Sequence, residues 1–406
     1  MVFGIFISII YASYSFLKKY NAIYFLPTFL LLNAIGDIFT DENEVVKWLK
    51  YAIIMLVLFR MLTFRAIKKY FSVFVFLGYL LIVVFLNSSD FFYSLKMYFI
   101  LFFTFLMLPV SEVLMMKSFS EKQFLKNLTF MMVLMPLYLV IANIYGGESL
   151  RNSYSEDFAG GLLSTTGSNL FPIVILSSLF YIITKRIRAM KKYISIGLVS
   201  LSMISLILIF RRTPIVMLLL SSFIFIYYYR VFSFSKGIIL LTFLSSFLLT
   251  NSKISNIFNA QLAARERIST VENYTNEGRV IETFLVLNYI KNEATPLELF
   301  FGSDALSTKE FGKRNFRGTR TIHSDISSLL VSVGVVGMFL FFYVVRKFII
   351  KTIPKGKSKG IYICLLLIFL LTLIPGRFIS SLTFSLPIFL FLGYFRFLGN
   401  VKSNNL

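Results

Sequence analysis

Long hydrophobic blocks alternate with short polar connections along most of the chain. Each block is about 15–25 residues long, the length that an α-helix needs to cross the hydrocarbon core of a bilayer. A membrane β-barrel would instead show segments of about ten residues with alternating hydrophobicity. The pattern therefore predicts an all-α, polytopic integral membrane protein. The expected spans are residues 3–17, 21–36, 49–63, 70–86, 91–115, 128–145, 169–184, 193–210, 214–229, 237–250, 326–345, 360–375 and 378–396.

Basic residues are concentrated in every second connection between these blocks, whereas connections such as 37–46 and 87–90 are acidic or neutral. Cytoplasmic loops of membrane proteins are enriched in lysine and arginine. About 12 or 13 spans are expected, and 13 spans with the amino terminus outside accommodate every basic connection. The first block has no basic n-region or cleavage site, so we expect a retained span rather than a signal peptide. The basic connections are Lys18–Lys19, Arg60–Lys69, Lys117–Lys126, Lys185–Lys192, Arg230–Lys236 and Arg346–Lys359.

Two connections on the expected outer side are long, at about residues 146–169 and 251–325. Loops of such length inside a compact protein usually have a function of their own. The chain is therefore expected to contain a helix bundle over 1–250, a long extracytoplasmic loop over 251–325 and further transmembrane helices over 326–406.

The composition supports a membrane protein. Hydrophobic residues make up 57% of the chain and charged residues only 15%, whereas about 25% of the residues of a soluble domain are charged. The net charge of +22 does not indicate nucleic-acid binding, because lysines and arginines lie beside the spans, where they contact anionic lipid and set the topology. The single cysteine, Cys364, lies in an apolar block, so neither a disulfide nor a thiolate metal site is expected.

Several arginines lie on the expected outer side, against the topology rule. Arg211 and Arg212 belong to a short turn between two spans, and Arg377 belongs to another. A cation at the end of a span is unfavourable unless it finds an anion. The simpler alternative is that each arginine extends to the lipid headgroups. Together with Arg151 in the first long outer loop, the set favours an anionic ligand.

The long outer loop contains three short patterns. An amphipathic helix is expected over 279–291, with Val280, Phe284, Leu287 and Ile290 on its apolar face. A glycine-containing turn, Phe301-Gly302-Ser303-Asp304, follows. Next comes a basic stretch with interleaved aromatic residues, for which an anionic headgroup or a glycan is a candidate ligand and a solvated charge run is the alternative. Its members are Lys309, Phe311, Lys313, Arg314, Phe316, Arg317 and Arg320.

His323, the only histidine in the chain, lies where this loop meets the following span. A lone histidine is more often structural than catalytic, but this one adjoins the basic loop on the side of the misplaced arginines. Imidazole titrates near neutral pH and can take a proton from a sugar hydroxyl. Four carboxylates are near enough in sequence to orient it, and the sequence selects none of them: Asp304, Asp325, Glu277 and Glu282.

The order of these features resembles the O-antigen polymerase and O-antigen ligase superfamily of bacterial polysaccharide assembly, whose members are many-span, GT-C-like membrane glycosyltransferases with one long external loop. The resemblance covers about residues 150–345, and its motifs are individually short. Arg151 matches only loosely, and Arg377 lies beyond the covered region. The shared elements are Arg211-Arg212-Thr213, Gly278-Arg279, Phe301-Gly302-Ser303-Asp304 and His323 with the glycine-containing span after it.

The resemblance implies a glycan on undecaprenyl pyrophosphate as substrate, in the bacterial cytoplasmic membrane with the active site on the extracytoplasmic side. It implies that His323 activates the acceptor hydroxyl and that arginines bind the pyrophosphate. Neither a metal nor another cofactor is implied, and a chain-length regulator is an expected partner. The pyrophosphate-binding candidates are Arg211, Arg212, Arg279, Arg320 and Arg377, and Arg279 is also a catalytic candidate. Asp325, Asp304, Arg317 and Arg151 are candidates for orienting His323 or binding glycan.

Three other functions remain open at this stage. A ligase that transfers the glycan to a lipid A core would use the same chemistry. A flippase for the same lipid-linked units would be expected to have charged residues deep in its spans, and the spans here are nearly free of charge. A receptor or assembly scaffold fits the long loop but does not explain the arginines.

Overall fold

The computed structural model describes residues 2–36, 44–145, 151–152, 155–159, 167–184, 189–209, 212–230, 278–316, 322–374, 378–379 and 381–403. Nearly all of them lie in helices, as expected for an all-α membrane protein. One short antiparallel pair, β1 (Arg151–Asn152) and β2 (Ser155–Ala159), lies in the first long connection.

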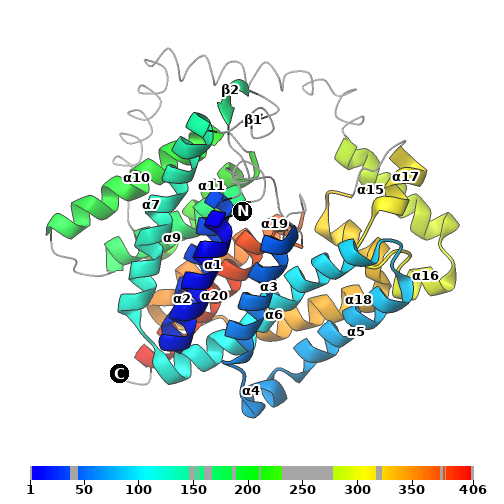
Figure 1. Ribbon diagram of the computed structural model, residues 1–406, viewed down its shortest axis with the longest axis horizontal. Coiled ribbons are helices and arrows are strands. Elements are labelled where there is room, and N and C mark those ends of the chain that lie inside the picture. Colours follow the sequence, from blue (N-terminus) through cyan, green and yellow to red (C-terminus); the bar gives the residue numbers. More distant parts are fainter. Residues whose placement is uncertain are drawn as a thin grey trace.

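The helices follow the hydrophobic blocks (Figure 1). The first half contains α1 (Val2–Leu17), α2 (Lys19–Gly36), α3 (Glu44–Phe59), α4 (Phe64–Lys69), α5 (Phe71–Asn87), α6 (Phe91–Ser118), α7 (Glu121–Tyr145), α9 (Leu170–Thr184), α10 (Ala189–Ile209) and α11 (Arg212–Tyr229). The second half contains α15 (Gly278–Asn288), the π-helical turn η3 (Tyr289–Glu293), α16 (Pro296–Phe301), α17 (Lys309–Phe316), α18 (Asp325–Phe348), α19 (Lys359–Leu373) and α20 (Leu382–Ser403).

Among the described residues, five helical segments are long and apolar enough to cross a membrane. They are Phe91–Ser118, Glu121–Ile141, Asp325–Thr352, Gly356–Leu373 and Leu382–Gly399, and six shorter apolar helices accompany them. Twelve of the expected spans coincide with helices, and the expected span at 237–250 lies outside the described residues. The predicted all-α membrane protein is thus confirmed, while the number of crossings stays a prediction.

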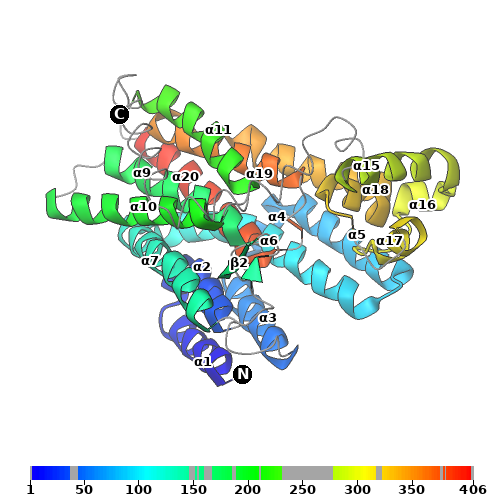
Figure 2. The same ribbon diagram turned by 90° about the horizontal axis from the view of Figure 1, so that it is seen from above.

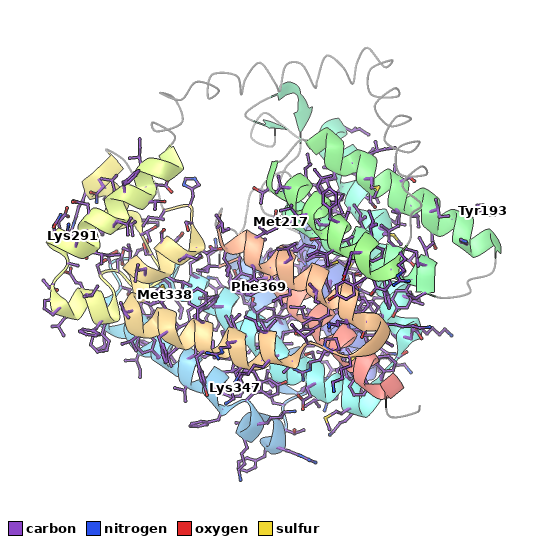
Figure 3. All side chains as sticks on the ribbon, turned by 180° about the vertical axis from the view of Figure 1, so that it is seen from behind. Tyr193, Met217, Lys291, Met338, Lys347 and Phe369 are labelled. Atoms are coloured by element: carbon purple, nitrogen blue, oxygen red, sulfur yellow. The ribbon has the colours of Figure 1, made fainter. Side chains whose placement is uncertain are left out.

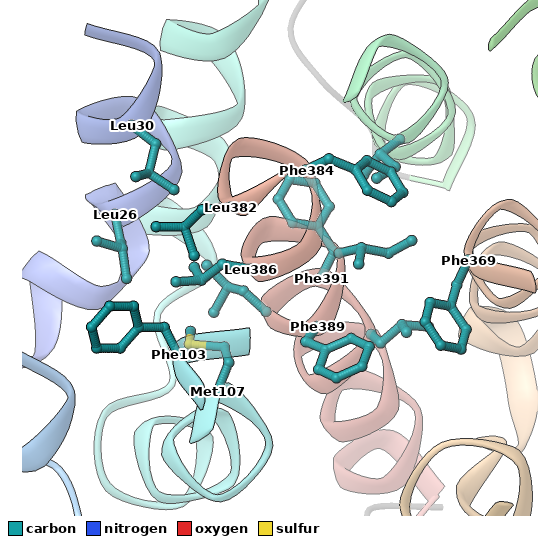
Figure 4. Close-up of a cluster of buried hydrophobic side chains, with 14 of the residues drawn as sticks. Leu26, Leu30, Phe103, Met107, Phe369, Leu382, Phe384, Leu386, Phe389 and Phe391 are labelled. Atoms are coloured by element: carbon teal, nitrogen blue, oxygen red, sulfur yellow. The ribbon is translucent and has the colours of Figure 1, made fainter. Parts of the chain in front are cut away.

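Helix α20 lies in the middle of the bundle and packs against α6, α19 and α2 (Figures 1 and 2). Leu382 and Leu386 face α2 and α6, whereas Phe389 faces Phe369 of α19 (Figure 4). Helices in lipid associate through close packing rather than through a hydrophobic driving force, and small residues permit that packing. Gly393 permits the close packing of α20 on α6, because a Cβ at this position would collide with the Ser111 side chain of α6.

Helix α18 is kinked at Gly334, whose φ of 67° and ψ of −175° interrupt the helical backbone. The kink leaves two carbonyls for partners outside the helix. Val331 O accepts from the Ser303 backbone N–H (2.9 Å), and Val333 O accepts from the Tyr79 hydroxyl (2.7 Å). A Cβ at Gly334 would collide with the backbone of residues 300 and 301, so only glycine permits this close approach of α16. The kink therefore fixes the turn after α16 against the bundle.

Five of the six predicted basic connections are joined, at or beside their ends, by hydrogen bonds of the described residues. These bonds place the described residues at or beside the five connections at one end of the bundle, which we call the basic end. The bonds are Arg60 Nη1 to Ser15 O (3.0 Å), Ser120 N to the Tyr24 hydroxyl (3.0 Å), Lys347 Nζ to Ser72 Oγ (3.4 Å) and the Tyr229 hydroxyl to Lys357 O (2.7 Å).

The opposite end is built by α15, η3, α16, α17, the α5–α6 turn and the start of α18, and we call it the loop end. Helix α18 extends from this end to the basic end, over 24 residues or about 35 Å. Figure 3 places Lys291 at the loop end and Lys347 near the other end of α18.

Candidate functional site

The side chain of His323 is hydrogen-bonded to Glu282 at the loop end. The imidazole Nδ1 lies 2.8 Å from Glu282 Oε1, and the backbone N–H of His323 donates to Glu282 Oε2 (3.0 Å). Both carboxylate oxygens thus hold one residue. With the carboxylate as acceptor, Nδ1 is the donor and Nε2 is left for another partner. The side chain of Glu282 is 3% exposed and that of His323 is 33% exposed. The buried carboxylate therefore orients an accessible imidazole.

Helix α15 buries one side and exposes part of its apolar face. The helix forms as expected, and of the predicted apolar positions Phe284 and Leu287 are exposed, while Ile290 packs partly buried against a small apolar cluster. The buried residues are Glu282, Val286 and Tyr289, whose spacing of four and three places them on one side of the helix. Glu282 is bonded there to His323, 41 positions away.

A small apolar cluster supports the pair. Val286 and Tyr289 of α15 pack with Phe311, Ile322 and Val331. The rings of Tyr289 and Phe311 meet edge to face, with centroids 5.5 Å apart. Because Ile322 directly precedes His323, this cluster fixes the backbone that presents the imidazole.

Asp304 does not orient His323. It is 3% exposed and lies in the turn after α16, where its Oδ1 accepts from the backbone N–H (3.0 Å) and the hydroxyl (2.8 Å) of Ser89. The neighbouring Gly302 carbonyl accepts from the Asn87 side chain. The predicted turn is therefore confirmed, and its role is to join α16 to the α5–α6 turn.

Asp325 is buried at the start of α18 and accepts a hydrogen bond from the backbone N–H of Phe378 (2.8 Å). Among the described residues, the carboxylate that is hydrogen-bonded to His323 is thus Glu282, whereas Asp325 bonds to Phe378. Phe378 follows Arg377 in the sequence, and Asp325 lies two positions after His323. The bond therefore fixes the segment between α19 and α20 beside the start of α18.

The basic stretch is partly neutralised. Lys309 pairs with Asp90 (2.9 Å) and lies 4.0 Å from the centre of the Tyr93 ring, while Lys313 pairs with Glu310 (2.6 Å). The hydrogen bond from Lys309 and the Tyr93 backbone N–H lower the pKa of Asp90. Phe311 is buried. Lys309 and Lys313 are thus paired with carboxylates, and Phe311 is part of the apolar cluster.

The candidate arginines are only partly placed. Arg279 lies in the first turn of α15, one turn before Glu282, and Arg212 begins α11. Arg151 lies in β1. Arg211, Arg317, Arg320 and Arg377 lie outside the described residues, as does Glu277. Among the described residues, no group of three or more histidine, cysteine or acidic side chains could hold a metal ion.

Several large apolar side chains are exposed on α15 and α16. They are Ile281, Phe284, Leu287, Leu297, Phe300 and Phe301. Helix α16 packs against α18, whose Val335 and Phe339 are also exposed. An exposed patch of this kind marks an interaction surface, and in a membrane protein lipid can cover it.

Comparison with known proteins adds no assignment: no family model matches the chain, and no curated protein matches it significantly.

Proposed function

We propose that this protein is a metal-independent membrane glycosyltransferase that joins lipid-linked oligosaccharide repeat units into O antigen, capsule or exopolysaccharide. The donor is a glycan on undecaprenyl pyrophosphate, and the reaction takes place on the extracytoplasmic face of the cytoplasmic membrane. The observation that carries the proposal is the His323–Glu282 pair, in which a buried carboxylate orients an accessible imidazole at the mouth of a membrane helix.

The pair suits the proton transfer that this reaction needs. The acceptor hydroxyl gives its proton to His323 Nε2 as its oxygen bonds to C1 of the donor sugar. The bond between C1 and the pyrophosphate oxygen breaks, and undecaprenyl pyrophosphate leaves with the electron pair. Glu282 stabilises the imidazolium that forms, as a carboxylate does in other histidine–carboxylate pairs.

The arginines would stabilise the leaving group. Guanidinium groups bind phosphate oxygens through paired hydrogen bonds, and they can offset the charge that develops on the pyrophosphate. Arg279 is the strongest candidate because it precedes Glu282 by one helical turn. The bond between Asp325 and Phe378 supports a role for the neighbouring Arg377. Arg211, Arg212 and Arg320 complete the proposed set.

The membrane orientation follows from the charges. The lysine-rich and arginine-rich connections meet at the basic end, which the topology rule assigns to the cytoplasm. The loop end then faces outward, and the exposed apolar side chains of α15 and α16 meet the outer leaflet, where a polyprenyl chain is anchored.

Transfer by purified protein in detergent tests the proposal, with a synthetic undecaprenyl-pyrophosphate repeat unit and EDTA throughout. We expect a glycan ladder from the wild type, and a rate about a hundredfold lower or more from His323→Ala and Arg279→Ala. Lys291→Ala is the matched control, because Lys291 is an exposed cation of the same region.

A folded wild type that makes no ladder from the correct repeat unit would refute the polymerase. The same protein would then be tested for ligation to a lipid A core, and after that for lipid flipping in proteoliposomes. Activity that persists in His323→Ala would remove the histidine from the mechanism.

A further inference from the structure

A cavity of about 310 Å³ lies at the loop end, between the α5–α6 turn and η3, α16 and α17. Tyr289, which lines it, follows Glu282 by seven positions, or about 10 Å along the helix axis. The cavity therefore lies beside the His323–Glu282 pair and is distinct from it. Its volume falls at the lower end of the range for small-molecule sites.

The lining of this cavity is rich in hydrogen-bond acceptors. Four carboxyl side chains line it, from Glu293, Glu298, Asp304 and Glu310, whereas Arg314 is the one cation among the described lining residues. An ionised carboxylate only accepts hydrogen bonds. The cavity is therefore suited to a ligand with several hydroxyl or amino donors, and it disfavours an acidic one.

Asp304 gives this lining its most specific feature. One of its oxygens, Oδ1, accepts two hydrogen bonds from Ser89, whereas the buried Oδ2 has no hydrogen-bond partner among the described residues. A buried polar atom without a partner is unfavourable and is uncommon in folded proteins. Asp304 lines the cavity, so a ligand donor that reaches Oδ2 there would satisfy it.

Aromatic walls complete the cavity. Tyr289 and Phe311 line it, and their edge-to-face contact holds both rings in place. Apolar and aromatic walls with a few fixed polar groups are typical of sites for small organic ligands. A sugar ring, with apolar C–H faces and hydroxyl donors at its edge, matches both parts of this lining.

We propose that this cavity binds a non-acidic sugar, neutral or amino, of the acceptor glycan, one or more residues away from the hydroxyl that reacts at His323. This inference rests on the proposed function, because it takes the ligand to be the acceptor of that reaction. The cavity then selects acceptors by excluding uronic acids and phosphorylated sugars, whose charge would face the carboxylates.

Direct binding tests the inference without any transfer step. Full-length protein in nanodiscs is titrated with an array of synthetic di- and trisaccharides that contains neutral, amino, N-acetylated and uronic-acid members. We expect neutral or amino members to bind and uronic-acid members not to bind.

Three variants place the binding site. Ser88→Tyr puts a ring into the cavity from the end of α5, where the extended backbone accepts any side chain. Asp304→Asn keeps Oδ1 for Ser89 and replaces Oδ2. Each should raise the Kd by about tenfold or more. Leu297→Tyr, at an exposed position of α16 outside the cavity, is the matched control and should leave the Kd unchanged.

The inference fails if no saccharide binds, if uronic acids bind best, or if Ser88→Tyr and Asp304→Asn leave the Kd unchanged. Its failure can be told apart from that of the proposed function. If the protein makes a glycan ladder but no saccharide binds in the cavity, the proposed polymerase is supported and the saccharide site is refuted. If saccharide binds and Ser88→Tyr abolishes the binding, but the protein makes no ladder, the saccharide site is supported and the polymerase is refuted.

Discussion

A carboxylate lies near each end of α18, Glu112 of α6 (14% exposed) and Glu282 of α15 (3% exposed), and the two are satisfied in different ways. At the basic end, Glu112 Oε1 accepts from Lys69 (2.6 Å), and Oε2 accepts from the Tyr70 hydroxyl (2.7 Å) and Arg396 Nη2 (2.8 Å). Arg396 also donates to the carbonyl of Phe348 (3.4 Å). At the loop end, both oxygens of Glu282 accept from His323.

Under the proposed function, the first carboxylate serves structure and the second serves catalysis. The Glu112 network joins α6, α18, α20 and the α4–α5 junction. The Glu282 pair ends in an imidazole that is one-third exposed. We therefore expect changes in the first network to alter stability, and changes in the second to alter activity.

The largest effect is expected from breaking the Glu112 network. Arg396→Leu removes one of the three side chains that hold the Glu112 carboxylate, which is 14% exposed, and this should reduce stability by about 2–3 kcal/mol. Thermal unfolding in detergent, followed by size-exclusion chromatography, measures the loss. The double variant with Glu112→Leu should recover most of it, because the carboxylate is then gone and the remaining cation, Lys69, is 57% exposed. A double variant as unstable as the single one would contradict a role based on charge pairing.

Glu282→Gln should lower activity and leave stability almost unchanged, in contrast to Arg396→Leu. It keeps the size of the side chain but removes the charge that stabilises the imidazolium, so transfer should slow by about 10–100-fold. The melting temperature should change by only a few degrees, since the amide oxygen can still accept from His323. A loss of activity fully matched by a loss of folded protein would make Glu282 structural, like Glu112.

Gly334→Ala tests whether the kink in α18 separates the two ends. A side chain at this positive φ, against the backbone of α16, should reduce stability by about 1–3 kcal/mol. The rate of transfer should fall by more than the loss of folded protein accounts for, because the turn after α16, which the new side chain displaces, also contacts the α5–α6 turn. Gly78→Ala is the control, since a Cβ there meets no atom within 4 Å. If Gly334→Ala and Gly78→Ala have the same melting temperature and the same rate of transfer, the kink has no role in stability or activity.

The smallest effect is expected at the Asp90–Lys309 pair, whose side chains are 43% and 32% exposed. Lys309 lowers the pKa of Asp90 in the folded protein, so the pair stabilises the fold above the unfolded pKa of about 3.9. This contribution is lost as the pH falls through the folded pKa. Asp90→Asn should therefore reduce stability by about 0.5 kcal/mol at pH 7 and by less at pH 3. A difference that grows toward pH 3 would contradict this sign.

Much of the helical framework could be predicted, because the bilayer restricts which backbone structures a hydrophobic segment can adopt. Block length and backbone hydrogen bonding leave a helix as the natural structure for a segment such as 91–115, and α6 covers it without a break. The candidate site could be predicted only in part. His323 was identified as a candidate because it is unique and adjoins the outer loop, whereas its partner could not be selected among four carboxylates.

Local pattern did not show which side of α15 is buried, because a distant residue decided it. Phe284 and Leu287 mark an apolar face that is exposed, whereas Glu282 lies inside, bonded to His323. The Glu112–Arg396 network joins positions 284 residues apart, and no short motif indicates it.

The sequence by itself determined the all-α membrane class, the helical segments and the gathering of basic connections, because each depends on hydrophobicity and charge within about 20 residues. The tertiary structure alone decided which face of α15 is buried, which carboxylate holds His323, and that Asp304 meets Ser89 beside a cavity. These outcomes depend on pairs far apart in the chain, whose energies exist only once the helices have packed.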